Sequence, residues 1–187
     1  DIEISGLSKK ENNILFQEIN KMNLGNIFFI KSKEIVSLMD SNPLIEKYEV
    51  KKKYPSAIYV KIQKTNFYAK ININDETFLI GSNGKLSPND LQNKDLPFIF
   101  GKPDIKEFLN FKNIIDQSKF SYDQIENLYF YPSKRWDLKL KNNILLKLSK
   151  NLNIEYLNNL YKFLEQDDLK KFTIVDARLK NQFILNE

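Results

Sequence analysis

The chain has 187 residues with a formal net charge of +5, from 29 Lys and Arg against 24 Asp and Glu, and it contains neither His nor Cys. This length allows a folded core, while the composition excludes disulfides, thiol nucleophiles, imidazole bases and the usual zinc sites. Any catalysis would depend on carboxylate, Lys or Tyr side chains.

The basic excess is spread along the chain, with a net charge of +2 over residues 1–90 and +3 over residues 91–187. Arg135 and Arg178 are the only arginines, whereas nucleic-acid recognition favours the planar guanidinium fork. We therefore predict no nucleic-acid partner. No run of 18 apolar residues and no signal-peptide pattern occurs. The chain opens on Asp1 without an initiator Met, so we expect it to be part of a longer protein.

Two helices follow an N-terminal strand. Residues 2–5 alternate apolar and polar side chains, which is the period of a strand. Ser8 and Glu11 form an S-x-x-E capping box, which predicts a helix from about Lys9 to Met22. Ser32 can cap a second helix, which the proline at position 43 would end. The expected inward face of this second helix comprises Ile35, Val36, Leu38 and Met39.

A basic hairpin completes the first module. Residues 48–54 are strand-like and contain the run Lys51, Lys52 and Lys53, and residues 58–62 alternate Ile or Val with polar residues. The order strand, helix, helix, strand, strand is typical of a small unit in which two helices cover one face of a three-stranded sheet. The lysine run fits a solvated strand that protects a sheet edge.

After residue 65 the pattern changes to short strands separated by turns. Asn83 and Gly84 form the strongest hairpin signal in the chain. Helices are expected from about Ile105 to Ile115 and from Ile154 to Leu164. The expected strands are 68–73, 77–80, 85–87, 128–131, 135–140, 144–148, 172–179 and 182–185.

These patterns predict an α+β protein. A β-α-α-β-β module is expected over residues 1–66, followed by a mixed β-rich domain with flanking helices over residues 67–187. Trp136, the only tryptophan, lies on a predicted strand, and we expect it to be buried against the helix at 154–164.

Candidates for catalysis or ion binding are few. Asp75 with Glu76, and Asp104 with Glu107, could serve the two-carboxylate chemistry of a hydrolase, but nothing in the sequence brings the pairs together. The acidic residues at 165, 167 and 168 lack the spacing of an EF-hand loop and fit a solvated loop better. We predict no catalytic residue, no metal and no cofactor.

Residues 2–7, 54–60, 96–101, 134–140 and 174–178 each contain a short motif, and in this order the motifs resemble those of the FtsQ/DivIB family of bacterial cell-division proteins. The opening strand 2–7 resembles the start of that family's POTRA module. The shared order of the motifs extends over essentially the whole chain. Further similar segments include Tyr54–Val60 with "WP-x-x-L-x-V", Ser82–Lys85 with "D-x-x-G-x", Leu96–Gly101 with "LP-x-x-x-G", Lys134–Leu140 with "RRWDLxL" and Ile174–Arg178 with "I-x-x-IDLR".

The resemblance implies a non-catalytic scaffold of the divisome that recruits FtsB-like and FtsL-like partners to the septum. It also implies a single-pass inner-membrane protein whose anchor precedes Asp1 and whose present region lies in the periplasm. The POTRA module would contact other division proteins, and Lys51, Lys52 and Lys53 are our candidates for that surface. The alternative is a periplasmic protein that binds cell-wall glycan, or a carboxylate-based hydrolase.

The last predicted strand ends the chain, so we expect it at a sheet edge. Such an edge offers unpaired backbone groups to which a partner strand can add by β-augmentation. In the family, a segment of FtsB adds to the C-terminal strands near two arginines that match Arg135 and Arg178. The alternative is an edge covered by chain segments outside this sequence or by neighbouring molecules. The predicted partner-binding residues are Arg135, Arg178, Leu179, Gln182, Phe183, Ile184 and Leu185.

Overall fold

The structure is a computed structural model that describes residues 2–22, 32–53, 57–89, 95–166, 172–179 and 182–186. The chain divides into two compact units. The first comprises residues 1–67 with 81–87, and the second comprises residues 68–80 with 88–187.

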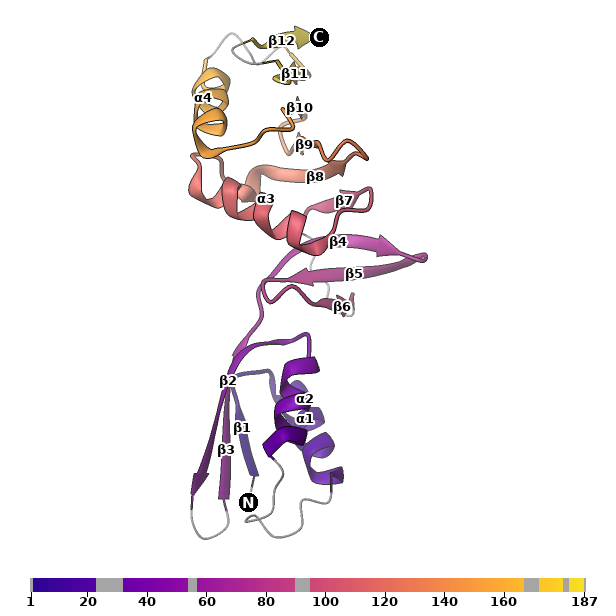
Figure 1. Cartoon of the computed structure of the whole chain (residues 1–187), viewed down its shortest axis with the longest axis vertical. Coiled ribbons are helices and arrows are strands. Elements are labelled where there is room, and N and C mark those ends of the chain that lie inside the picture. The colour runs from indigo at the N-terminus through magenta and orange to yellow at the C-terminus, as the bar shows by residue number, and fades with distance from the viewer. Residues whose placement is uncertain are drawn as a thin grey trace. The chain divides into compact units, whose positions relative to one another are not determined.

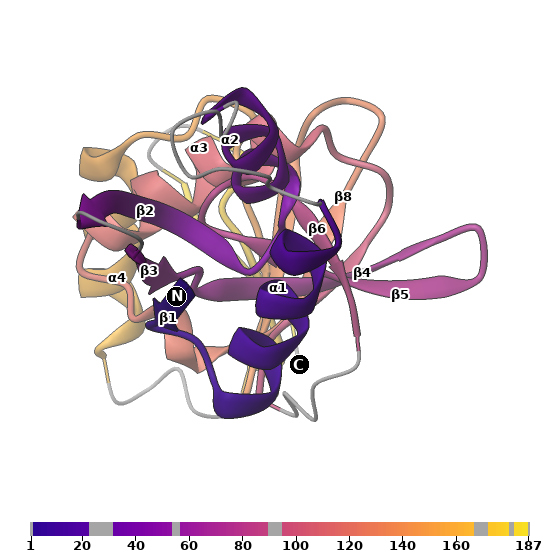
Figure 2. The same ribbon diagram turned by 90° about the horizontal axis from the view of Figure 1, so that it is seen from below.

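The first unit is a three-stranded sheet with two helices on one face (Figures 1 and 2). The strand order is β1-β3-β2, with β1 parallel and β2 antiparallel to the central strand. The predicted β-α-α-β-β order is therefore confirmed. Its elements are β1 (Ile2–Ser5), α1 (Lys9–Lys21), α2 (Ser32–Ser41), β2 (Ile45–Lys53) and β3 (Ala57–Lys64).

The capping box predicted for the first helix is present. The Ser8 hydroxyl accepts a hydrogen bond from the Glu11 backbone N–H, and the Glu11 carboxylate accepts one from the Ser8 N–H at 2.8 Å. Glu11 also receives the Lys64 ammonium at 2.9 Å, which joins the start of α1 to the end of β3. On α2, Ile35 and Met39 are buried, whereas Val36 is 40% exposed. The prediction that Val36 faces inward was wrong, because only one edge of a short helix reaches the core.

The second sheet has the strand order β12-β11-β10-β9-β8-β7-β4-β5-β6. Figure 1 shows α3 (Ile105–Gln117) and α4 (Ile154–Leu164) on one face of its strands β8–β12. The strands are β4 (Phe67–Ile73), β5 (Glu76–Gly81), β6 (Leu86–Pro88), β7 (Phe98–Phe100), β8 (Ile125–Phe130), β9 (Trp136–Leu140), β10 (Leu145–Lys147), β11 (Ile174–Asp176) and β12 (Ile184–Asn186), with a short 3-10 helix at Tyr122–Gln124.

Two features of this sheet were not predicted. The strand β7 has three residues, too few for any periodic pattern, yet it pairs in parallel with both β4 and β8. The turn between β4 and β5 places Asn74 and Asp75 at φ 50° and 65°, which is the left-handed pair required by a two-residue hairpin. Asp75 therefore serves a turn here. The Asn83-Gly84 turn is present as predicted, with Gly84 at φ 74°.

A buried lysine joins α3 to β4. The Lys112 side chain lies 4.5 Å and 4.2 Å from the ring centroids of Tyr68 and Tyr122 and donates to the Asp116 carboxylate at 2.6 Å. Tyr122 in turn donates its hydroxyl to the Tyr68 carbonyl at 2.9 Å, and burial raises the pKa of that hydroxyl. The two aromatic faces and the carboxylate together compensate the ammonium for the water it loses on burial.

Trp136 is buried, with 4% of its surface exposed, as predicted. Its ring stacks on Phe111 of α3 at 4.6 Å and also contacts Phe108 of α3 and Phe130 of β8. We had expected the packing helix to be the one at 154–164, but α3 supplies the stacked ring. Sequence periodicity identifies an apolar helix face without indicating which strand that face covers.

Replacement Trp136→Ala should lower the free energy of unfolding by about 3–5 kcal/mol, since it leaves a cavity under three aromatic rings. Urea denaturation measures the change. Unfolding is monitored by circular dichroism, because tryptophan fluorescence is lost with the side chain. A variant with wild-type stability would contradict this structural role.

Candidate functional site

The C-terminal strand forms one edge of the second sheet. Among the described residues, β12 pairs with β11 alone, with Val175 opposite Leu185 and Asp176 opposite Ile184. Ile184 is 49% exposed, and the preceding Leu179 is 55% exposed. The edge therefore presents backbone groups and an apolar side chain on an accessible strand, which is the geometry that strand addition requires.

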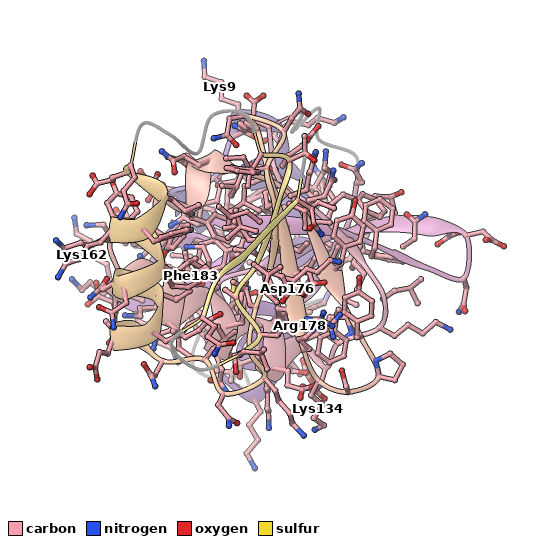
Figure 3. All side chains as sticks on the ribbon, turned by 90° about the horizontal axis from the view of Figure 1, so that it is seen from above. Lys9, Lys134, Lys162, Asp176, Arg178 and Phe183 are labelled. Atoms are coloured by element: carbon pink, nitrogen blue, oxygen red, sulfur yellow. The ribbon has the colours of Figure 1, made fainter. Side chains whose placement is uncertain are left out.

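Phe183 has a different place from Ile184. Its ring stacks on Phe163 of α4, with centroids 4.3 Å apart. Figure 3 shows Phe183 toward α4, whereas Asp176 and Arg178 lie farther from that helix. Phe183 thus attaches β12 to the helix-covered side, and Ile184 is the apolar residue of the pair left exposed.

Tyr156 on α4 holds the strand beneath this edge. Its hydroxyl donates to the Ala177 carbonyl at 2.6 Å and accepts from the Ser149 N–H at 3.1 Å. Burial, together with the nearby carboxylates of Asp176 and Asp137, raises the pKa of Tyr156, so the phenol keeps its proton and remains a donor. Sequence reasoning missed Tyr156, because a tyrosine on an amphipathic helix does not stand out as an anchor.

Arg135 and Arg178 lie on the open face of the sheet, opposite α3 and α4. Each lies just outside a strand and donates to a carboxylate two residues away in the sequence: Arg135 to Asp137 of β9 at 3.1 Å, and Arg178 to Asp176 of β11 at 2.8 Å. The Arg135 guanidinium also lies 4.4 Å from the centre of the Tyr131 ring. Both arginines are therefore already paired within the chain, and a partner carboxylate would bind their remaining N–H groups.

Asp137 is the most deeply buried charge of this face, with 1% of its surface exposed. Its carboxylate accepts from Arg135 and from the Leu148 backbone N–H at 3.3 Å. Lys147 stands opposite Asp137 on one side and opposite Asp176 on the other. The carboxylates that hold the two arginines therefore lie on β9 and β11, with β10 between them, although Arg135 and Arg178 are 43 residues apart in sequence.

The lysine run lies on β2, an edge strand of the first sheet. All three lysines are exposed. Lys51 pairs with Glu49 at 3.1 Å, and the Lys53 ammonium lies 6.0 Å from the centre of the Tyr59 ring. Because strand side chains alternate, Lys51 and Lys53 share the sheet face away from the helices, and Lys52 lies on the other.

A hollow of about 460 Å³ lies beside the C-terminal edge. Among the described residues that line it, Glu155 is the one carboxylate, whereas the hydrolase alternative needs two. The carboxylates considered for that chemistry have other partners: Asp104 caps α3, and Glu107 pairs with Lys134 at 3.1 Å. The hollow is lined by Ser149, Asn151, Asn153, Glu155, Tyr156, Asn159, Leu179 and Phe183.

No group of three or more acidic side chains that could hold a metal ion occurs within the described ranges. In the same part of the chain, every helix is too short or too polar to cross a bilayer. The acidic positions 167 and 168, considered for a cation, lie outside the described residues, as do 180 and 181 in the predicted C-terminal turn.

Comparisons with known proteins agree across both units. Residues 1–64 match the family model for the FtsQ-type POTRA domain, and residues 69–178 match that for the C-terminal region of the cell division protein FtsQ/DivIB. The chain is 24% identical to the cell division protein FtsQ of Rickettsia bellii over 209 aligned positions, covering 100% of the chain and 71% of that protein. It is 23% identical to FtsQ of Rickettsia typhi, covering 93% of the chain and 71% of that protein.

A solved structure is also similar. It is the major extracytoplasmic domain of the trans isomer of the cell division protein DivIB from Geobacillus stearothermophilus, with a TM-score of 0.41 and 11% sequence identity. The similarity covers 54% of this chain and 90% of that one.

The Asp176–Arg178 pair predicts a dependence of stability on pH. Hydrogen bonds from Arg178, opposed by partial burial, lower the pKa of Asp176 from its ordinary value of 3.8. A lowered pKa means that the ionised carboxylate stabilises the fold above pH 3.8 and that this contribution disappears as the pH falls through the folded-state value.

The difference in unfolding free energy between the wild type and Asp176→Asn should therefore be constant near neutral pH. It should shrink as the pH falls below 3.8, the ordinary pKa of an aspartate. Urea denaturation between about pH 2 and pH 7 measures it. A difference that stays constant down to the lowest pH would show that the pair does not stabilise the folded state.

Proposed function

Because this chain belongs to the FtsQ/DivIB family of bacterial cell-division proteins, we propose that it acts as a non-catalytic scaffold that recruits FtsB-like and FtsL-like partners by β-augmentation on β12. The family establishes a role in the divisome. The observation that carries the proposal is the exposed C-terminal edge, where Ile184 is 49% exposed on a strand that pairs with one neighbour among the described strands.

The partner strand would pair with the outer side of β12. Main-chain hydrogen bonds would supply affinity, and the apolar Ile184 together with Leu179 would supply side-chain contacts. Arg135 and Arg178 would meet acidic residues of the same partner through the N–H groups that Asp137 and Asp176 leave free. Gln182 and Leu185 belong to the same hairpin, with Leu185 opposite Val175.

The setting of this scaffold follows from the family and is likewise part of the proposal. A membrane anchor before Asp1 would hold the protein in the inner membrane as a single-pass protein. The region described here would lie in the periplasm at the septum, divided into a POTRA-like module over residues 1–66 and a β domain over residues 67–187.

A pair of proline variants tests the edge. Adjacent backbone N–H groups point to opposite sides of a strand, so Ile184→Pro and Leu185→Pro each remove one donor, one directed at β11 and the other at the partner. The variant that removes the outer donor should keep native circular dichroism and thermal stability. It should weaken binding of the purified FtsB-like protein by at least ~1 kcal/mol, about fivefold.

The other variant, which breaks β11–β12 pairing, should lower thermal stability and serves as the matched control. If both proline variants remain folded and both bind the partner as tightly as the wild type does, the interface lies elsewhere. Titration calorimetry with the FtsB-like protein of the same genome gives the affinities.

Substitution of the lysine run on β2 tests whether this strand contacts other division proteins. Triple substitution of Lys51, Lys52 and Lys53 by Glu should abolish septal localisation of the full-length protein, because a basic surface that attracts acidic partners becomes acidic. Circular dichroism should stay native, since all three side chains are exposed.

A matched control makes the same charge change on α1, at the exposed residues Lys9, Lys10 and Lys21. This control should localise normally. Unchanged localisation of the β2 variant, or equal loss in both, would exclude the lysine run as the recruitment surface.

A further inference from the structure

An aromatic cluster occupies the open face of β7 and β8. The rings of Phe98 and Phe100 lie 4.9 Å apart, and Phe100 stacks on Tyr129 at 5.0 Å with an interplanar angle of 12°. Phe100 is 45% exposed. The residues that these strands contribute to the core are the alternate ones, Ile99 and Leu128, which are 2% and 0% exposed. The cluster is therefore outside the core of the sheet.

One cross-strand row connects this cluster with the C-terminal edge. Directly opposed residues of neighbouring strands share a sheet face, so the row lies on the open face from end to end. Its apolar ends are Phe100 and Ile184, and its middle is charged. The row runs Phe100, Tyr129, Asp137, Lys147, Asp176 and Ile184.

The middle of the row, taken together with the side chains beside it on the open face, has a net positive charge. Arg135 is neutralised by Asp137 and Arg178 by Asp176. Lys139 and Lys147 add two cations, since alternation along β9 and β10 places them on the same face as Asp137. The open face therefore offers a basic centre between two exposed apolar ends, which complements an acidic segment with apolar residues at both ends.

We propose that the partner segment that adds to β12 continues across the open face and seats an aromatic or large aliphatic side chain on the cluster of Phe98, Phe100 and Tyr129. This inference rests on the proposed function. Five strand spacings separate Ile184 from Phe100, a span of about 24 Å. The crossing segment must therefore contain at least about seven residues if extended, or about sixteen if helical, with acidic residues in its middle.

Two other occupants fit less well. A second copy of this chain would bring the same basic surface and would be repelled by the centre of the row. A glycan would stack on open ring faces, but Phe100 and Tyr129 each use one face against the other. Charge and ring geometry therefore favour an acidic protein segment.

Site-directed photo-crosslinking in the native cells tests the path. Benzoyl-phenylalanine replaces Phe100 or Ile184 in the full-length protein, and Ile154 on α4, which is 36% exposed, is the control position. The expected result is that positions 100 and 184 both capture the FtsB-like protein of the same genome, at sites at least about seven residues apart with acidic residues between them, while position 154 does not.

Capture at 184 without capture at 100 would overturn the crossing path and leave the proposed strand addition intact. Capture at neither position would overturn both. A glycan adduct, a second copy of this chain, or a different protein at position 100 would each overturn the inference.

Affinity gives an independent measurement. Phe100→Ala should weaken binding of the purified FtsB-like protein about tenfold, because the ring would be covered by the partner in the complex. Ile154→Ala should leave the affinity unchanged. Thermal melting of both variants controls for folding. Equal affinities for Phe100→Ala and the wild type would overturn the role of the cluster.

Discussion

Alternation of side chains along the second sheet determines which residues of its open face are available to a partner. α3 and α4 cover one face, so Ile99, Leu128, Leu138 and Val175 enter the core. Their strand neighbours must then point to the open face, because successive strand residues face opposite sides. A shift of one residue in a strand would bury its charged side chains and expose its core residues, so a change of register would strongly destabilise the sheet.

Burial of carboxylates on the open face explains why the two arginines are placed there. Asp137 is 1% exposed and would destabilise the sheet strongly if left unpaired. The Asp137 carboxylate accepts hydrogen bonds from Arg135 and from the Leu148 N–H, and the Asp176 carboxylate accepts them from Arg178. Each arginine therefore stabilises the fold while its side chain stays partly exposed, by 22% for Arg135 and 46% for Arg178. In this arrangement a partner carboxylate would bind a guanidinium whose position is already determined, so little conformational entropy is lost on binding.

The three-residue β12 depends on tertiary contacts more than on its own pairing. A strand this short makes few ladder hydrogen bonds, and its stability comes from α4 through the Phe183–Phe163 stack and from Tyr156 beneath β11. These contacts hold the edge in place, and no described strand pairs with its outer side. An edge that is both held and open suits strand addition, because the partner need not order it.

The sequence by itself determined the order and type of most elements, since capping residues, periodic helices and alternating strands are local signals. The Ser8–Glu11 capping box and the helix at Ile154–Leu164 were predictable for that reason. It also indicated a C-terminal edge strand from position alone. The tertiary structure decided which elements pack together and which residues share a sheet face, because local sequence patterns do not encode these features. The strand β7 is too short for periodicity, and the ring that stacks on Trp136 comes from α3. The row from Phe100 to Ile184 joins residues up to 84 positions apart, which only the pairing of neighbouring strands brings onto one face.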